Sequence, residues 1–475
     1  MQSRAPAMEF PADLAWVNTD HPPRIAGLRG RVGLIWFWSY DSVNCWNMVP
    51  DLGRLEDKYH DGLTVVGMHC PKYPHQRDDA AVLQAVNRLR LRHAVANDAD
   101  FRLWRGYGVE AWPSVALVDA EGRLAALLAG EGRGDEIDVH VARLLDDAAS
   151  RDLRVYEPSR PASRPEPRRA LAFPAAIHVD GKVLHVSDSG HHRVLECGHD
   201  GRVLRCFGSG DAGHVDGDPA QACFDDPRGL ARHAGLLYVA DRGNHCVRSI
   251  DLADGRVDTV LGTGRAGRSR PHHAAARATP MNTPLDLCVI EDDLLVAVAG
   301  QNQIWRLDLT RGRVSILAGS GALGLVDGDG EEAEFAQPSG LDAYGRHLIV
   351  VDAAASAVRF VNIDTGSVGT AIGSGLYEFG DASGARADTR LQNPLAVAAD
   401  PRGTIHIADS YNGSIKLHNR RSGGTRPLRL DYRLHEPRGL CLAGGRLWIA
   451  NTNLHEIVCV DLASGVARRV PVAEA

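Results

Sequence analysis

Two hydrophobic patterns divide the chain. In the first 150 residues, short apolar runs alternate with stretches whose apolar residues fall on one helical face, which is typical of an α/β unit. The run Val32–Trp38 predicts a buried strand, and the stretch after it predicts a helix with one apolar face, formed by Met48, Leu52, Leu55 and Tyr59. From residue 171 onward, short strands follow one another between turn residues, which predicts an all-β unit.

The order of elements in the first unit, residues 1–149, follows from the same patterns. Further strands are expected at residues 63–68, 94–96, 111–118 and 124–128. Helices are expected to begin near Asp78, to cover residues 101–104, and to end the unit around Ile137 and Leu144. Pro50 falls inside the first helix and should kink it, because proline removes one main-chain hydrogen bond.

The turn between the first strand and the first helix reads Ser42-Val43-Asn44-Cys45. A strand, a tight turn and a helix that opens on a cysteine resemble the active site of thioredoxin-like proteins, whose order of elements is also the one predicted here. The resemblance places Ser42 where those proteins carry the attacking cysteine, and it leaves Cys45 in the resolving position. Because thiol–disulfide exchange requires a sulfur nucleophile, we expect the usual dithiol chemistry to be absent from this turn.

The same resemblance implies a groove that binds peptides. Trp112-Pro113 occupies the place of the family's cis-proline, so a cis peptide bond is expected there. Six residues around this bond and the helix-opening turn are expected to line the groove: Asp41, Ser42, Asn44, Trp46, Trp112 and Pro113.

Cys45 and Cys70 are the candidate reactive residues. The start of a helix lowers the pKa of a thiol, but full burial can raise it by more, so we expect Cys45 to be mostly protonated at neutral pH. The alternative is an enzyme, a thiol-disulfide oxidoreductase or peroxide-responsive sensor, that uses Cys45 alone or with Cys70. A bridge between the two would need Cα atoms within about 7 Å of each other.

Residues 150–170 are expected to form a linker. Proline and arginine dominate this stretch, at Pro158, Pro161, Pro165, Pro167, Arg151, Arg154, Arg160, Arg164, Arg168 and Arg169. Spaced prolines favour an extended, semi-rigid tether. A solvated basic spacer is the favoured interpretation, and contact of the arginines with RNA or an acidic partner is the alternative.

The second unit, residues 171–475, is built from a repeat. In six places a proline precedes an apolar run, and the next strand ends a fixed interval later. The prolines are Pro174, Pro227, Pro284, Pro338, Pro394 and Pro437, and the strand ends are Asp188, Asp241, Val298, Asp352, Asp409 and Asn451. The intervals are 14, 14, 14, 14, 15 and 14 residues. With three or four strands in each repeat, this periodicity predicts a six-bladed β-propeller.

The repeats resemble NHL repeats. The matching signatures run from Val239 to His245 and from Val186 to Arg193, and the third repeat departs from the pattern because Val298 replaces aspartate. A thioredoxin-like domain joined to such a propeller resembles the NHL-repeat-containing thioredoxin-like proteins. Larger members carry a further C-terminal β-domain, which this chain is expected to lack.

The repeated polar residues suggest structural roles. Asp188, Asp241, Asp352 and Asp409, with Asn451, occupy one position of each blade and are expected to accept backbone N–H groups of the following turn. A metal lyase centred on the propeller is the alternative for the turn histidines, but the spacing of His191, His192, His245 and His455 matches no metal-ligand pattern. We therefore expect no metal.

Two arginines stand out in the repeats. Arg228 and Arg438 each occur in Pro-Arg-Gly-Leu and are expected to face the propeller axis. Pairing with a neighbouring carboxylate is favoured, and binding of an anion is the alternative.

Composition limits the compartments and partners that are expected for this protein. The 475 residues are 44% hydrophobic, carry a net charge of −7, and contain neither a long apolar run nor an apolar leader core, so a cytoplasmic protein without membrane contact is expected. The nine irregularly spaced cysteines suit a reducing compartment. We expect the propeller to serve as a protein-binding platform and the first unit to serve as a peptide-binding or redox-linked module, without a cofactor. RNA binding by the propeller is a further alternative, which the acidic balance disfavours.

Overall fold

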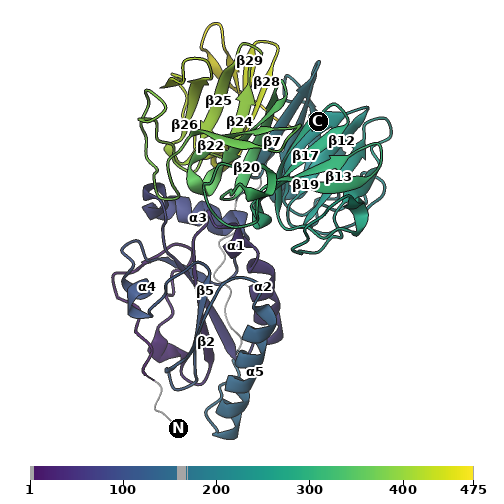
Figure 1. Ribbon diagram of the computed structural model, residues 1–475. Coiled ribbons are helices and arrows are strands. Elements are labelled where there is room, and N and C mark those ends of the chain that lie inside the picture. Colours follow the sequence, from purple (N-terminus) through teal and green to yellow (C-terminus); the bar gives the residue numbers. More distant parts are fainter. Residues whose placement is uncertain (1–4, 158–166, 168, 474–475) are drawn as a thin grey trace. The chain divides into compact units, whose positions relative to one another are not determined.

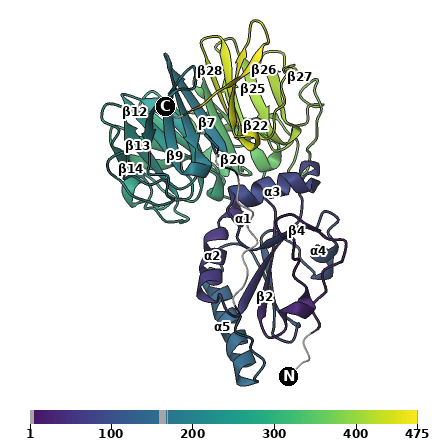
Figure 2. The same cartoon turned by 180° about the vertical axis from the view of Figure 1, so that it is seen from behind.

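The computed structural model describes residues 5–157, 167 and 169–473, and it confirms the predicted fold class. The chain forms two compact units, Met1–Pro167 and Arg168–Ala475. The first is an α/β unit around one mixed sheet, and the second is a ring of six antiparallel sheets (Figures 1 and 2).

The first unit contains a six-stranded sheet in the order β1-β4-β3-β2-β5-β6. The strands are β1 (Ala15–Trp16), β2 (Val32–Trp38), β3 (Leu63–His69), β4 (Ala94–Asn97), β5 (Ser114–Val118) and β6 (Leu124–Ala129). The helices are α1 (Val43–Trp46), α2 (Val49–Lys58), α3 (Asp79–Arg88), α4 (Arg102–Gly106) and α5 (Gly134–Ser150), with short 3-10 turns η1 (Ile25–Leu28) and η2 (Pro74–Arg77). β2 runs parallel to β3 and antiparallel to β5. The turn that contains Ser42 and Cys45 follows the carboxyl end of this central strand.

Strand β2 is buried along its whole length because both faces of the sheet are covered. Ile35 and Phe37 pack on one face into a cluster with Leu103 of α4. On the other face, the rings of Trp36 and Trp38 stack with centroids 4.8 Å apart. Figure 1 shows α2 and α5 lying together along one side of the sheet and α4 on the opposite side.

The first helix differs from its prediction. It is interrupted after Trp46 and resumes at Val49, so Pro50 lies in the first turn of α2 rather than inside a continuous helix. A main-chain N–H in a first turn has no helical partner, so proline there costs no hydrogen bond. Pro50 thus marks a break between two helices and not a kink within one.

Two further details of the first unit were not predicted. β1 pairs antiparallel with β4 in a segment expected to be irregular. The first residues of the expected linker pack on this unit, because Arg154 pairs with Asp61 and the N–H of Val155 donates to the carbonyl of Gly30. The rest of the predicted linker, residues 158–166 and 168, lies outside the described residues.

The second unit consists of six blades whose four strands follow each other in chain order. Blade 1 contains β7 (Pro174–Asp180), β8 (Val183–Asp188), β9 (Arg193–Gly198) and β10 (Val203–Phe207). Blade 2 contains β11 (Pro227–His233), β12 (Leu236–Asp241), β13 (Cys246–Asp251) and β14 (Val257–Leu261). Blade 3 contains β16 (Pro284–Ile290), β17 (Asp293–Val298), β18 (Gln303–Asp308) and β19 (Arg313–Ala318), and β15 (Ala274–Ala275) extends its sheet. Blade 4 contains β20 (Pro338–Tyr344), β21 (His347–Asp352), β22 (Ala357–Asn362) and β23 (Val368–Ile372). Blades 5 and 6 are β24 (Ala396–Ala399), β25 (Thr404–Asp409), β26 (Ser414–Asn419), β27 (Thr425–Pro427) and β28 (Pro437–Ala443), β29 (Arg446–Asn451), β30 (Glu456–Asp461), β31 (Ala467–Val470).

Short 3-10 turns join the second and third strands of five blades. They are η3 (Ser189–His191), η5 (Ala299–Gln301), η7 (Ala353–Ala355), η8 (Ser410–Asn412) and η9 (Thr452–Leu454), while η4 (Ala276–Ala278) and η6 (Gly330–Glu332) lie in loops between blades. Each of the first set ends on a left-handed residue, namely His192, Asn302, Ser356, Gly413 and His455.

One hydrogen bond recurs at the junctions between blades. The left-handed residue accepts the N–H of the residue that precedes the next blade's first proline. For example, the N–H of Asp226 donates to Nδ1 of His192 at 3.1 Å. The same bond joins four further pairs: His245 with Thr283, Asn302 with Gln337, Ser356 with Asn393, and His455 with Phe173. The last pair connects blade 6 to blade 1. The innermost strands also pack side by side, including β28 against β7, so the ring is closed.

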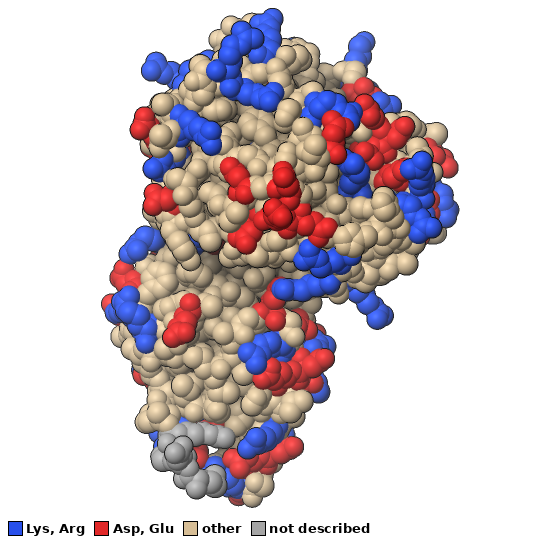
Figure 3. All heavy atoms as spheres, viewed as in Figure 1, with Lys and Arg blue, Asp and Glu red and all other residues tan. Residues whose placement is uncertain are grey.

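The surface carries charges of both signs. Figure 3 shows Lys and Arg interspersed with Asp and Glu, and a group of acidic side chains on the face of the propeller in view. Among the residues that the structure describes, no helix is long and apolar enough to cross a membrane.

Candidate functional site

Ser42 begins helix α1 as its N-cap. Its Oγ accepts the N–H of Cys45 at 3.4 Å, and its backbone is extended, as an N-cap requires. The indole Nε1 of Trp46 donates to the carbonyl of Tyr40 at 2.9 Å, and this bond stabilises the same turn. The hydroxyl at the attacking position therefore serves to start the helix.

Cys45 lies behind this turn and is fully buried. Burial raises the pKa of its thiol to about 12, because the lost hydration of the thiolate outweighs a hydrogen bond from Ser42. The expected dominance of burial over the helix start is thus what the structure shows. A protonated, buried thiol is a poor nucleophile at neutral pH.

Cys70 follows strand β3 and is also fully buried. Its Sγ lies 3.6 Å from the carbonyl of Met68 and 3.9 Å from a carboxylate oxygen of Asp98. Burial, followed by the negative charge of Asp98, raises the pKa of Cys70 well above its usual value. Cys45 and Cys70 are both free thiols, so no disulfide replaces the missing dithiol in this structure.

His69 is a buried residue of this region that sequence reasoning did not single out. Its ring stacks on Tyr40 at 5.2 Å, and Nδ1 lies 3.0 Å from Oδ1 of Asn97. Burial lowers the pKa of His69 to about 4, so the ring is neutral at physiological pH. The available signal was its position at the end of β3, in register with Trp38 at the end of β2.

The expected groove residues differ in exposure. Asn44 is exposed, Ser42 and Trp112 are half-buried, and Trp46 and Pro113 are buried. Asp41, expected to line the groove, is 8% exposed. Its carboxylate accepts Nε2 of Gln76 at 2.7 Å and the hydroxyl of Ser39. The structure therefore uses Asp41 to hold the turn, through partners that lie up to 35 residues away in the sequence.

The peptide bond between Trp112 and Pro113 is cis, as expected. The ring of Trp112 packs against Trp104 with centroids 4.7 Å apart and against Phe101 at 6.3 Å. Trp112 thus anchors this loop to α4.

The repeated aspartates of the propeller are buried and fully engaged, but their backbone donors differ from the prediction. Asp241 accepts the N–H of Asp225 at 2.8 Å, which lies 16 residues earlier in the loop that enters the blade. The equivalent donors to Asp188, Asp352, Asp409 and Asn451 are Ala172, Ala336, Gln392 and His435. The prediction of a bond to the backbone of the following turn is wrong for these acceptors, since each side chain reaches back to the entry loop.

A buried cation completes several of these positions. The guanidinium of Arg248 is fully buried and pairs with Asp241 at 2.9 Å and with Asp216 of the entry loop at 2.6 Å. Two further blades repeat this arrangement, with Arg359 between Asp352 and Asp327 and with Lys416 between Asp409 and Asp381. The cation lies seven residues after the aspartate, a spacing visible in the sequence but not used there.

Blade 3 replaces this ion pair by an apolar pair. Val298 stands at the aspartate position, and Trp305, seven residues later, stands at the cation position. Both belong to one buried hydrophobic cluster. The two substitutions compensate each other, because a lone charge in this place would be costly.

The axial arginines are paired with carboxylates, as favoured from the sequence. Nη2 of Arg228 donates to Asp226 at 2.8 Å, and Nη2 of Arg438 donates to Glu436 at 2.9 Å.

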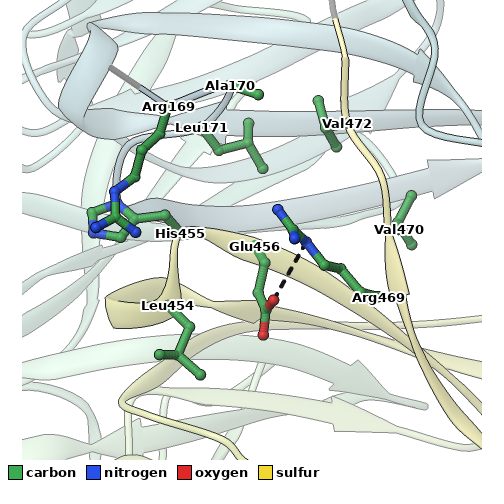
Figure 4. A pocket seen from close by; sticks show the side chains of 9 residues that line it. All are labelled: Arg169, Ala170, Leu171, Leu454, His455, Glu456, Arg469, Val470 and Val472. Atoms are coloured by element: carbon green, nitrogen blue, oxygen red, sulfur yellow. Dashed lines mark ion pairs between the residues drawn. The ribbon is translucent and has the colours of Figure 1, made fainter. Parts of the chain in front are cut away.

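A cavity of about 200 Å³ lies at the junction of blades 6 and 1 (Figure 4). Its lining consists of Arg169, Ala170, Leu171, Leu454, His455, Glu456, Arg469, Val470 and Val472. Glu456 pairs with Arg469 at 3.5 Å and also accepts hydrogen bonds from Asn451 and Tyr432. The acidic group of this cavity is therefore already bound within the propeller.

Comparison with known proteins agrees with both units. Residues 224–248 match the NHL repeat. Human NHL repeat-containing protein 2 is 32% identical over 522 aligned positions, which cover 98% of this chain and 71% of the human protein. The chain belongs to the NHL repeat-containing protein 2 family.

Other relatives extend this family assignment. The Arabidopsis thaliana protein SUPPRESSOR OF QUENCHING 1, chloroplastic, is 33% identical over 499 positions. The alignment covers 98% of this chain and 47% of that protein. The Bacillus subtilis thiol-disulfide oxidoreductase YkuV is 26% identical over 145 positions, covering 30% of this chain and 97% of YkuV. This chain is thus a two-module protein, part of which is similar to a thiol-disulfide oxidoreductase.

Proposed function

We propose that this NHL repeat-containing protein 2 family member acts by recognition rather than by dithiol exchange. The observation that carries the proposal is the pair Ser42 and Cys45. Ser42 caps a helix where a nucleophile would stand, and Cys45 is buried with a strongly raised thiol pKa. The thioredoxin-like unit would then contribute a peptide-binding surface near Asn44 and Trp112.

The propeller would serve as a platform for a protein or peptide partner. Four large apolar side chains are exposed in loops between blades: Val215, Leu323, Val326 and Tyr377. Each of these loops connects the outermost strand of one blade to the innermost strand of the next, so they lie at the same end of the propeller. Exposed apolar residues gathered at one end support a protein-binding role.

We further propose a reducing compartment such as the cytoplasm. All nine cysteines are free thiols, and buried free thiols are compatible with such an environment.

Disulfide reductase assays on the full chain test the main proposal. The unmodified protein should show negligible reduction of insulin disulfides. Ser42→Cys should gain activity, because it restores two thiols at the spacing of the thioredoxin turn. Asn44→Cys is the matched control, since it adds a thiol to the same turn at the wrong spacing and should gain none. Efficient turnover by the unmodified protein would refute the proposal.

A thiol-based enzyme remains the second candidate, because the first unit is similar to YkuV over nearly the whole of that protein. It would require Cys45, alone or with Cys70, to become accessible. RNA binding has weaker support, since the net charge is −7 and Figure 3 shows acidic side chains gathered on one face of the propeller.

A further inference from the structure

Arg228 and Arg438 occupy the same place in two blades on either side of blade 1. Each is the second residue of its innermost strand, directly after the proline that begins it. Blade 1 carries Ala175 at the equivalent position. The innermost strands β28, β7 and β11 pack side by side, which brings the two residues to the same end of the propeller axis.

Both guanidinium groups are buried and only partly satisfied. Arg228 and Arg438 are 6% and 9% exposed. Each donates from Nη2 to its carboxylate, whereas Nε–H has no hydrogen-bond partner in the described part of the chain. An unmet buried N–H group is costly, so these donors mark a place where an acceptor would be favourable.

Several charged groups lie close together here: the carboxylates of Asp225, Asp226 and Glu436 and the guanidinium groups of Arg228, Arg242 and Arg438. Asp226 accepts from Arg242 as well as from Arg228, so three guanidinium groups surround Asp226 and Glu436. Burial, opposed by Asp226 and supported by the charges of Arg438 and Arg242, lowers the pKa of Arg228 to about 10. The charge of Arg438 thus affects the pKa of Arg228 across blade 1. Both arginines are charged at physiological pH.

We propose that Arg228 and Arg438 form a binding site for an oxyanion, a phosphate or carboxylate group, at the end of the propeller axis where the innermost strands begin. Guanidinium groups suit this chemistry because their planar N–H donors match the oxygens of such anions. An oxyanion between the two arginines accepts from the donors that the protein leaves unmet. This site is separate from the peptide-binding role proposed above.

Titration of the full-length protein with inorganic phosphate tests the proposal, with succinate as a second arm and chloride holding the ionic strength constant. Calorimetry should show saturable binding, and the Nε–H NMR signals of Arg228 and Arg438 should shift with the same saturation curve. A response to phosphate alone, to succinate alone or to both identifies which oxyanion the site accepts. No saturable response to either would overturn the proposal.

Variants locate the site. Arg228→Met and Arg438→Met should each weaken binding roughly 10- to 100-fold, because each removes charge-assisted hydrogen bonds. Arg232→Met is the matched control, since Arg232 lies on the same strand, pairs with Asp180 and is partly exposed; its affinity should equal that of the unmodified protein. Arg438→Lys keeps the charge and should weaken binding less than Arg438→Met. Unchanged affinity in the double variant Arg228→Met/Arg438→Met would overturn the assignment, and the NMR shifts of the unmodified protein decide if that variant does not fold.

Discussion

The two units differ in the partners that they give to some of their buried ionisable groups. In the thioredoxin-like unit, burial leaves Cys45 and Cys70 protonated and His69 neutral. In the propeller, the guanidinium groups of Arg248 and Arg359 are fully buried, and each lies between two carboxylates. Burial disfavours the charged form of a group, and an opposite charge nearby opposes that effect.

This difference indicates where each unit can do chemistry. The first unit has lost a nucleophile at Ser42 and holds its remaining thiols in a neutral state. The second unit places buried cations beside buried carboxylates, so we expect the propeller rather than the first unit to recognise charged groups.

The largest expected effect comes from breaking a buried ion pair in the propeller. Arg248→Met should lower the free energy of unfolding by about 3–5 kcal/mol, because it leaves Asp241 buried without its cation. Urea unfolding of the full chain measures the change. Arg256→Met is the control, since its partly exposed pair with Asp258 should contribute no more than about 1 kcal/mol. Equal losses in the two variants would contradict the comparison.

The second test concerns the neutral histidine of the first unit. The pKa of His69 is lower in the folded state, about 4, than in an unfolded chain, so the folded state binds fewer protons below pH 6.5. Stability from this residue should therefore be complete above pH 6.5 and fall by roughly 3 kcal/mol as the pH drops to 4.

His69→Gln should remove that part of the pH dependence, measured by urea unfolding between pH 4 and 7. His21→Gln, at an exposed position, should leave it unchanged. An unaltered slope in His69→Gln would show that His69 is not buried in its neutral form.

Alkylation tests directly whether the thiol of Cys45 is protonated and inaccessible. Cys45 should react with iodoacetamide more than about 100-fold more slowly at pH 7 than the exposed Cys206, because both its thiolate fraction and its access are reduced. Mass spectrometry of the native protein gives both rates in one experiment. Reaction of Cys45 at pH 6 ahead of the other eight cysteines would instead support a thiol-based sensor.

The smallest expected effect would sharpen the comparison within the propeller. Val298→Asp introduces a lone charge into blade 3, and Trp305→Arg introduces its cation. The double variant should be more stable than the sum of the single changes by roughly 1–3 kcal/mol, because the two new charges pair. Strict additivity would show that the entry loop of this blade cannot accommodate the pair.

The fold could be read from the sequence because its signals are local and repeated. The proline-to-aspartate interval predicted six blades, and the apolar run Val32–Trp38 predicted the central strand. Strand β1 was missed because two residues carry no periodic pattern. The break before Pro50 was missed because the apolar face continues across it, and only the position of the helix start decides whether proline costs a hydrogen bond.

The candidate sites were less predictable because their partners are distant in sequence. The positions of Ser42 and Cys45 follow from a compact motif, and the cis bond before Pro113 follows from the family resemblance. The inward bonding of Asp41 depends on Gln76, which no spacing rule connects to it. Similarly, the entry-loop donor to Asp241 becomes its neighbour only when the blade is assembled.

The recurring bond at the blade junctions has a consequence for the topology of the ring. The junction between blades 6 and 1 uses His455 and Phe173 in the way that the internal junctions use His192 with Asp226 or His245 with Thr283. The four main strands of each blade are consecutive in the chain, and the C-terminal segment adds a bridge between Ala473 and Arg202 of blade 1. The ring is therefore close to cyclically symmetric, and a circular permutant opened at a different junction keeps every blade whole.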